Sequence, residues 1–176
     1  GAGDDQMRIA GMLMILSGCM GAGIWYSQLC IRKWRNLQNC QKALMILRNE
    51  IIYGRTPLPV AFAQMAGRTS GSISVFFDTV SRRLEEGGGR LEDIWTASLQ
   101  EILTASEMRQ EDRQELAGLG NTLGYLDARM QVQALELYEK RLEGSLLAWE
   151  QEKEKKARLY PVLGTMGGAL ICLIIM

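Results

Sequence analysis

The chain has 176 residues, and its 20 basic residues balance its 20 acidic residues. A balanced charge creates no global field for nucleic acid, and the absence of histidine removes the commonest general base and zinc ligand. The four cysteines form no C-x-x-C pair, so their spacing indicates neither a metal site nor a disulfide framework.

The first predicted element is an apolar helix at the N-terminal end. We expect residues 1–6 to be an extension upstream of a native start at Met7. Ile9 to Ile31 carry no charge, and about 20 helical residues cross the hydrocarbon core of a bilayer. Residues 7–31 are therefore predicted to be a transmembrane helix. Two of its glycines would let another membrane helix approach closely, and these are Gly18 and Gly21.

Two processing routes compete with this anchor. Met7-Arg8 could begin a secretory signal peptide, but the apolar run is longer than usual and no A-x-A site ends it. Leu16-Ser17-Gly18-Cys19 has the form of a bacterial lipoprotein processing site. Residues 20–25, however, are apolar where a lipoprotein usually has a polar tether. An uncleaved anchor is the favoured interpretation.

The middle of the chain predicts a bundle of about six helices. Apolar residues recur there at spacings of three and four, which is typical of helices with one buried face. From Trp34 to Tyr53, for example, the stripe is Leu37, Cys40, Leu44, Leu47 and Ile51. The six expected helices cover 34–53, 57–66, 73–85, 91–103, 107–119 and the region from 127 onward.

Several residues are expected to begin, end or bend these helices. Thr56 is predicted to cap the second helix, with Pro57 at its first position because proline has no N–H to satisfy. Gly120 and Gly124 indicate a bend or close helix packing, and Asp127 is predicted to cap the final helix. That helix is expected to keep an inward stripe of Met130, Ala134, Leu135, Tyr138, Leu142, Leu146 and Trp149.

A second uncharged run closes the chain. Residues 159–176 contain no charge and no polar face, so they are predicted to be a C-terminal transmembrane helix. Three of its glycines have the spacing for close helix contact, and these are Gly164, Gly167 and Gly168.

Basic residues flank both apolar runs on the side of the central region. The positive-inside rule therefore predicts a cytoplasmic domain over 32–158, between two membrane helices. The lipid bilayer is then a partner of the chain. The basic residues that set this topology are Arg32, Lys33, Arg35, Lys153, Lys155, Lys156 and Arg158.

No catalytic or cofactor motif emerges from the sequence. Gly118, Gly120 and Gly124 lack the G-x-x-x-x-G-K-[ST] pattern of a phosphate-binding loop. The acidic pairs Glu85-Glu86 and Glu92-Asp93 are interpreted as solvated helix surfaces. Ser70, Ser72 and Ser74 have no candidate base. We therefore expect a protein that is not an enzyme and has no cofactor, no metal, no nucleic-acid partner and no small-molecule substrate.

Two strings in the central region resemble those of the stage III sporulation protein AB family. The first is E-I-x-Y-G-x-T-P-L at Glu50, Ile51, Tyr53, Gly54, Thr56, Pro57 and Leu58. The second is G-x-T-L-G-x-x-D at Gly120, Thr122, Leu123, Gly124 and Asp127, followed by Gln131. With the apolar ends, the resemblance covers nearly everything from Met7 to Met176.

The resemblance implies a function that the spacing of residues alone does not. It implies a scaffold in the transport complex between mother cell and forespore, with its central domain in the mother-cell cytoplasm. That domain is then similar to the platform proteins of type II secretion and type IV pilus systems. The implied partners are a secretion-type ATPase subunit, similar to stage III sporulation protein AA, and other membrane proteins. A general secretion or pilus platform is the alternative, although this chain has no internal repeat.

Overall fold

A computed structural model describes the backbone of residues 2–54, 56–124 and 127–175. Side chains are described throughout 25–54, 56–124 and 127–152, and at seven positions before residue 25. This part of the chain contains six α-helices, one π-helix and no strand, which confirms the all-α prediction. The elements are α1 (Ala2–Asn49), η1 (Glu50–Gly54), α2 (Leu58–Arg68), α3 (Gly71–Glu85), α4 (Leu91–Ile102), α5 (Gln110–Leu123) and α6 (Ala128–Ile175).

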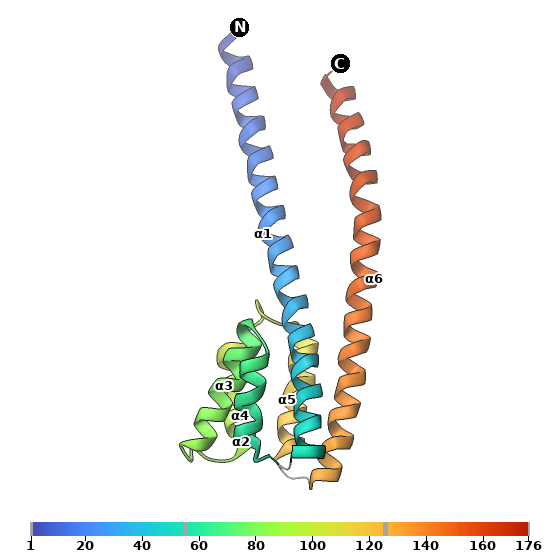
Figure 1. Cartoon of the computed structure of the whole chain (residues 1–176). Coiled ribbons are helices and arrows are strands. Elements are labelled where there is room, and N and C mark those ends of the chain that lie inside the picture. Colours follow the sequence, from blue (N-terminus) through green and yellow to red (C-terminus); the bar gives the residue numbers. More distant parts are fainter. Residues whose placement is uncertain (1, 55, 125–126, 176) are drawn as a thin grey trace.

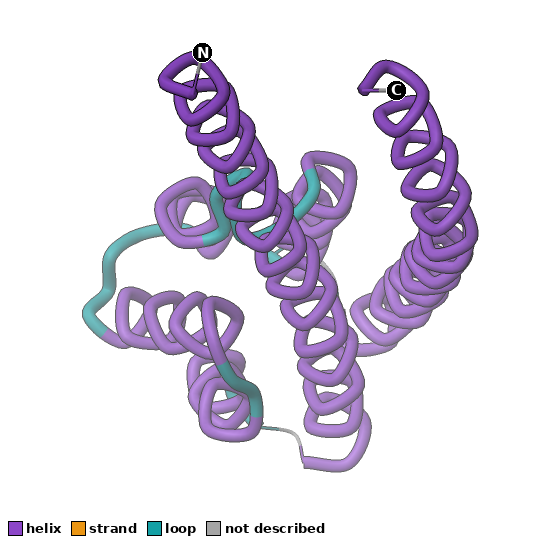
Figure 2. Tube along the Cα trace, turned by 90° about the horizontal axis from the view of Figure 1, so that it is seen from above, coloured by secondary structure: helices purple, strands orange, loops and turns teal. Residues whose placement is uncertain are grey.

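Two long helices dominate the shape of the molecule. Helices α1 and α6 each have 48 residues, and both chain termini lie at the same end (Figure 1). Helices α2 to α5 gather beside the half of α1 that is farther from the termini. Helices α2 and α3 pack against α1, whereas α5 packs against α4 and α6; Figure 2 shows the bundle from above. We call the end opposite the termini the base of the bundle.

The core is centred on four aromatic rings from three helices. Phe62 of α2, Phe76 and Phe77 of α3 and Trp95 of α4 are each fully buried. The centroids of Phe76 and Trp95 lie 4.9 Å apart in an edge-on arrangement, and those of Phe62 and Phe77 lie 6.0 Å apart. Such ring pairs add to the stability that burial alone gives.

Helix α1 supplies the other wall of this core. Leu37, Cys40, Leu44 and Leu47 are 0–1% exposed, which confirms the predicted stripe. The stripe belongs to one continuous helix from Ala2, because no breaker separates the apolar N-terminal run from the amphipathic segment. Burial raises the pKa of the Cys40 thiol to about 12, so this cysteine is an unreactive core residue.

The prediction that Thr56 caps α2 is wrong. Helix α2 begins at Leu58 after Pro57, and no side chain caps its first amides. The Thr56 hydroxyl instead donates to Glu50 Oε2 at 2.9 Å. A hydrogen bond to a carboxylate is stronger than one between a hydroxyl and a backbone amide, so the Thr56 hydroxyl bonds to Glu50 instead of capping α2. This bond links the π-helical turn to the start of the next segment.

The predicted helix over 107–119 is displaced along the chain. Helix α4 ends at Ile102, residues 103–109 form turns, and α5 begins at Gln110. Glu107 and Met108 donate their backbone N–H groups to Thr104 O at 3.0 and 3.1 Å within this connection. The displacement leaves the Glu107 side chain free to reach other helices.

Of the two motif glycines in α5, only Gly120 is a position of close packing. A Cβ atom at Gly120 would lie 2.2 Å from Trp95 Cδ1, whereas one at Gly124 would have its nearest neighbour at 3.8 Å. Gly120 lies inside α5 and is buried, so no bend occurs there, and Gly124 ends the helix in an ordinary right-handed conformation. The close helix packing predicted for the two glycines is therefore found at Gly120 and not at Gly124.

Helix α6 begins as predicted and packs on α1, α5 and η1. Asp127 Oδ1 accepts the Met130 N–H at 3.0 Å, which confirms the predicted cap. Leu135 and Leu142 are buried, but Met130 is 51% exposed, so its assignment to the inward stripe is wrong. Met130 faces away from the body because its neighbour Gln131 makes the inward contact, donating to Leu123 O at 2.9 Å. The helix continues past Pro161 to Ile175.

Candidate interaction surface

The first motif forms a compact clasp at the base of the bundle. Glu50 and Thr56 close it through their hydrogen bond, and Gly54 lies inside it. A Cβ atom at Gly54 would lie 2.6 Å from Thr56 Oγ1 and 2.7 Å from Glu50 Oε2. A larger residue at this position would therefore have to displace the Thr56 or Glu50 side chain and disturb their hydrogen bond.

The clasp presents one aromatic side chain to solvent. Tyr53 is 83% exposed and Ile52 is 44% exposed, although both belong to the π-helical turn η1. Leu58, the last residue of the motif, packs against the core instead. Pro57 is exposed. A π-turn that directs large apolar side chains outward is a feature often found at functional sites.

The second motif builds the joint between α5 and α6. Leu123 is buried, and its carbonyl accepts the side-chain amide of Gln131. Trp95 Nε1 donates to Leu116 O at 2.8 Å, one helical turn before Gly120. Gly118, outside the motif, also allows close packing, because a Cβ atom there would lie 2.6 Å from the Tyr138 hydroxyl oxygen.

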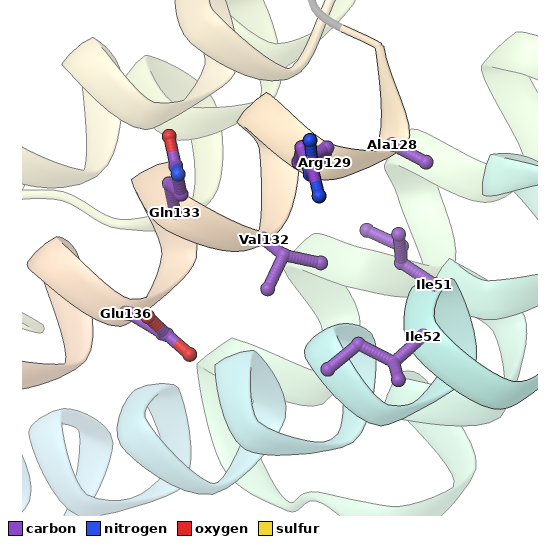
Figure 3. A pocket seen from close by; sticks show the side chains of 7 residues that line it. All are labelled: Ile51, Ile52, Ala128, Arg129, Val132, Gln133 and Glu136. Atoms are coloured by element: carbon purple, nitrogen blue, oxygen red, sulfur yellow. The ribbon is translucent and has the colours of Figure 1, made fainter.

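The two motifs, about 70 residues apart in sequence, meet at the base of the bundle. A shallow groove of about 460 Å³ runs between η1 and the first turns of α6 (Figure 3). Exposed Tyr53 and Met130 lie next to its lining residues in the sequence. We call it the basal groove, and it is lined by Ile51, Ile52, Ala128, Arg129, Val132, Gln133 and Glu136.

The basal groove combines an apolar wall with two charged side chains. Ile51, Ile52 and Val132 form its apolar wall, and Arg129 and Glu136 supply one charge of each sign. Within the described residues, no three Cys, Asp or Glu side chains converge to hold a metal ion. Apolar residues beside a few polar ones are typical of protein-binding grooves.

Ser72 does have a carboxylate neighbour, which the sequence did not indicate. Its hydroxyl donates to Glu107 Oε2 at 2.5 Å, and Asn36 and Arg32 donate to the same carboxylate at 3.0 and 3.2 Å. Burial alone would raise the pKa of Glu107, but these three donors outweigh it and lower the pKa. A carboxylate with a lowered pKa is a poor base for Ser72. The three hydrogen bonds connect α1 and α3 to the 103–109 turn.

Comparison with known proteins gives the same answer from sequence and from structure. The profile of the stage III sporulation protein AB family matches residues 8–176. The chain belongs to the stage III sporulation protein AB family. Stage III sporulation protein AB of Bacillus subtilis (strain 168) is 26% identical over 171 residues, covering 97% of this chain and all of that protein.

A solved structure of a stage III sporulation protein AB has the same fold. It aligns with a TM-score of 0.65 and 28% identity, over 70% of this chain and 98% of the solved one. Family membership identifies a sporulation protein. In this chain, residues of the two family motifs make the Thr56–Glu50 and Gln131–Leu123 hydrogen bonds of the clasp and the helix joint.

The residues predicted to set the topology are only partly described. Arg32 pairs with Glu107 at 3.2 Å, Arg35 is exposed and Lys33 is half-buried. The other four, Lys153, Lys155, Lys156 and Arg158, have side chains outside the described residues, as do Gly164, Gly167 and Gly168. Gly18 and Gly21 are exposed, and a Cβ atom added to either would meet nothing within 4 Å.

Among the residues whose side chains the structure describes, no helix has a stretch that is both long and apolar enough to cross a bilayer. All side chains of the predicted C-terminal span, 159–176, and many of those in 7–31 lie outside the described residues.

Proposed function

We propose that this family member is a membrane-anchored scaffold of the transport complex that sporulating cells build between mother cell and forespore. Residues 7–31 and 159–176 cross the mother-cell membrane around the forespore, and residues 32–158 form a domain in the mother-cell cytoplasm. The uncharged runs and the basic residues on their inner flanks support this arrangement. The domain is a platform for a secretion-type ATPase subunit and for other membrane proteins of the complex.

One observation carries the proposal: the two termini lie at one end of the molecule, and the family motifs lie at the other (Figure 1). If both termini enter the membrane, the base of the bundle is the part of the domain farthest from the bilayer. The basal groove is then directed toward the cytoplasm, where a soluble partner can reach it. The Glu107 cluster joins Arg32 and Asn36, in the second half of α1, to the 103–109 turn, nearer the termini than the base.

The exposed residues at the base are suited to binding a protein. Tyr53 and Ile52 are large, apolar and exposed beside a groove that can accept a partner side chain. Aromatic residues at the centre of an interface commonly contribute most of the binding energy. A tyrosine side chain has only two χ angles to fix, so ordering Tyr53 on binding costs little conformational entropy.

The test is recovery of the complex from crosslinked sporulating cells. We expect Ile52→Glu to reduce the ATPase subunit recovered with this chain by about tenfold, as for loss of a hot-spot residue. Val75→Glu is the matched control, because Val75 is 54% exposed on α3, away from the motifs. Equal recovery with both variants would contradict the platform role of the base.

The proposed topology has an independent test. A protease-sensitive tag after Met176 is expected to be cleaved only from outside the mother-cell membrane, because both membrane helices end there. Cleavage of the same tag only from the cytoplasmic side would contradict the membrane hairpin. A tag inserted at the exposed Gly87-Gly88-Gly89 turn is the control, and it is expected to be cleaved only from the cytoplasm.

A further inference from the structure

Helix α6 divides its described residues between a buried face and a free face with a seven-residue period. In a heptad that starts at Met130, positions b, c and f pack toward the body, and Leu135 and Leu142 occupy buried f positions. The a, d and g positions and most e positions are exposed. The free face is therefore the one that a coiled-coil partner would contact. Its a and d residues are Met130, Gln133, Leu137, Lys140, Gly144, Leu147 and Gln151.

Apolar residues recur along this free face. Met130, Leu137 and Leu147 are 51%, 50% and 55% exposed, although each is large and apolar. Gly144 lies between the two leucines, and a Cβ atom there would meet nothing within 4 Å. The glycine leaves a gap in the row that a larger side chain could fill. We call these four residues the α6 stripe.

The charges beside the α6 stripe match a parallel copy of the same helix. Glu136 is at a g position and Arg141 follows five residues later at an e position, which is the spacing that pairs across a parallel coiled coil. Both side chains are about half exposed. Glu136 pairs with Arg48 and Arg141 with Glu115 within the chain, and both groups can take a further hydrogen-bond partner. In the sequence the spacing recurs at Glu150 and Lys155, although Lys155 lies outside the described side chains.

Lys140 at a d position does not oppose this pairing. It is exposed, and Glu136 and Glu143 lie four residues before and three residues after it on the same helix. Its long side chain can extend past the contact to either carboxylate while its methylene groups cover apolar surface. The polar d position weakens the contact and favours one register.

We propose that the α6 stripe is a contact between two copies of this chain, with their α6 helices parallel and in register. The inference rests on the proposed membrane anchoring, because two copies in one membrane have their α6 helices running in the same direction. Two platforms are then held side by side, with both basal grooves at the cytoplasmic end.

The test is disulfide trapping in the full chain reconstituted in phospholipid vesicles. The native cysteines are first replaced by alanine or serine, and single cysteines are placed by Leu137→Cys, Leu147→Cys or Val75→Cys. Parallel helices in register bring equivalent a or d positions within the Cα separation that a disulfide requires, about 4.4–6.8 Å. We expect Leu137→Cys and Leu147→Cys each to form a homodimer, and Val75→Cys, equally exposed on α3, to remain monomeric.

A second set of variants tests the chemistry of the contact. In the Leu147→Cys background, Leu137→Lys is expected to lower the trapping rate about tenfold, whereas Val75→Lys leaves it unchanged. Gly144→Leu is expected to raise the rate severalfold by filling the gap in the stripe. Gly144→Ala is its control, because alanine improves helix propensity but adds little contact area.

Each outcome either supports or overturns the inference. Trapping only between mixed Leu137→Cys and Leu147→Cys chains would indicate antiparallel helices and contradict it. No trapping in chains that resist carbonate extraction from the vesicles would also overturn it. If the chain is extracted, the membrane anchoring fails separately, and the same variants are trapped in solution. Leu137→Cys homodimers there would support the contact, and their absence would refute it.

Discussion

The aromatic body of this protein and its final helix are held together by different physics. Helices α2, α3 and α4 meet through four buried rings, with centroid distances of 4.9–6.0 Å. Helix α6 meets α1 and α5 through ion pairs, a cation–π contact and, among its described residues, two buried leucines, Leu135 and Leu142. Among the described residues, four buried side-chain polar atoms lack a hydrogen-bond partner, and Arg48 Nε, Glu139 Oε1 and Trp149 Nε1 belong to this α6 seam.

The contrast indicates which part of the fold is rigid and which can adjust. Apolar ring packing involves no titrating group and no screened charge, whereas an ion-paired seam depends on both pH and ionic strength. In the seam, Arg109 stacks 3.6 Å above the Trp149 ring, and Arg48 lies 3.2 Å from Glu139. We expect α6 to open locally before the aromatic body unfolds.

Removing one ring should have the largest effect. Phe76→Ala deletes a fully buried ring that contacts Phe77 and Trp95, and we expect a loss of about 3–5 kcal/mol in the free energy of unfolding. Urea unfolding of the full chain measures this. Val75→Ala, at an exposed neighbour, should cost far less. Similar losses for both variants would show that the rings do not form the core.

Adding bulk between α4 and α5 should have the next largest effect. Gly120→Val places a side chain into the Trp95 ring, and we expect a loss of about 1–3 kcal/mol from overpacking. Gly124→Ala is the control, because its new methyl group meets ordinary contacts and its backbone is right-handed. A larger loss of stability in Gly124→Ala than in Gly120→Val, measured by urea unfolding, would contradict the assignment of close packing to Gly120.

Breaking the seam should release α6 without unfolding the body. Arg48→Met leaves the Glu139 carboxylate, only 14% exposed, without its closest cation, and we expect a loss of about 1–2 kcal/mol after allowing for partial solvation. Hydrogen exchange should accelerate in peptides from 128–152 and not in α2 to α4. Adding Glu139→Gln should reverse most of the change. Uniform acceleration over all helices would mean that body and seam form one cooperative unit.

Loss of the α6 cap should be smaller. Asp127→Ala removes the acceptor for the Met130 N–H, which typically costs about 0.5–1 kcal/mol. Hydrogen exchange in the first turn of α6 reports the change. Asp127→Ser keeps a cap and should remain close to wild type. An unchanged exchange rate in Asp127→Ala would contradict the assigned cap.

The pH dependence should differ in sign between the α6 seam and the Glu107 cluster. Burial raises the pKa of Asp112 and Glu139 in the seam, so their stabilising contribution is present at low pH and is lost as the pH rises through their raised pKa values. Hydrogen bonds lower the pKa of Glu107, so its contribution is lost as the pH falls through that lowered value. Mild acid should therefore slow exchange in α6, corrected for intrinsic rates. Asp112→Asn should reduce that response, and faster exchange in mild acid would contradict it.

The sequence predicted best where apolar spacing decides the structure. The stripe of Leu37, Cys40, Leu44 and Leu47 is buried as predicted, and Asp127 caps α6. Helix boundaries between 56 and 124 shifted by a few residues because polar side chains found distant partners. Thr56 bonds to Glu50, and Glu107 bonds to Asn36 and Ser72. No local pattern encodes such pairings.

The motif residues beside the basal groove were singled out from the sequence, but most of the residues that line the groove were not. The two motif strings identified Glu50, Tyr53, Gly120 and Asp127, but their meeting at one end depends on how α1 and α6 pack. Met130 is predicted to face inward because the apolar spacing of the final helix is compatible with either of two faces at its first turn. The contact of Gln131 with Leu123 turns Met130 outward, and the sequence does not indicate that contact. The packing role of Gly120 likewise depends on Trp95, 25 residues earlier.

The most direct measurement of the platform claim is photo-crosslinking from the base of the bundle in sporulating cells. A benzophenone amino acid is placed at Tyr53, which is 83% exposed, or at Val75, which is 54% exposed, in the full chain. The proposed function predicts a covalent product with the ATPase subunit from position 53 and none from position 75. That product from position 75 alone, or from neither position while the complex assembles, would contradict the role of the base as a platform.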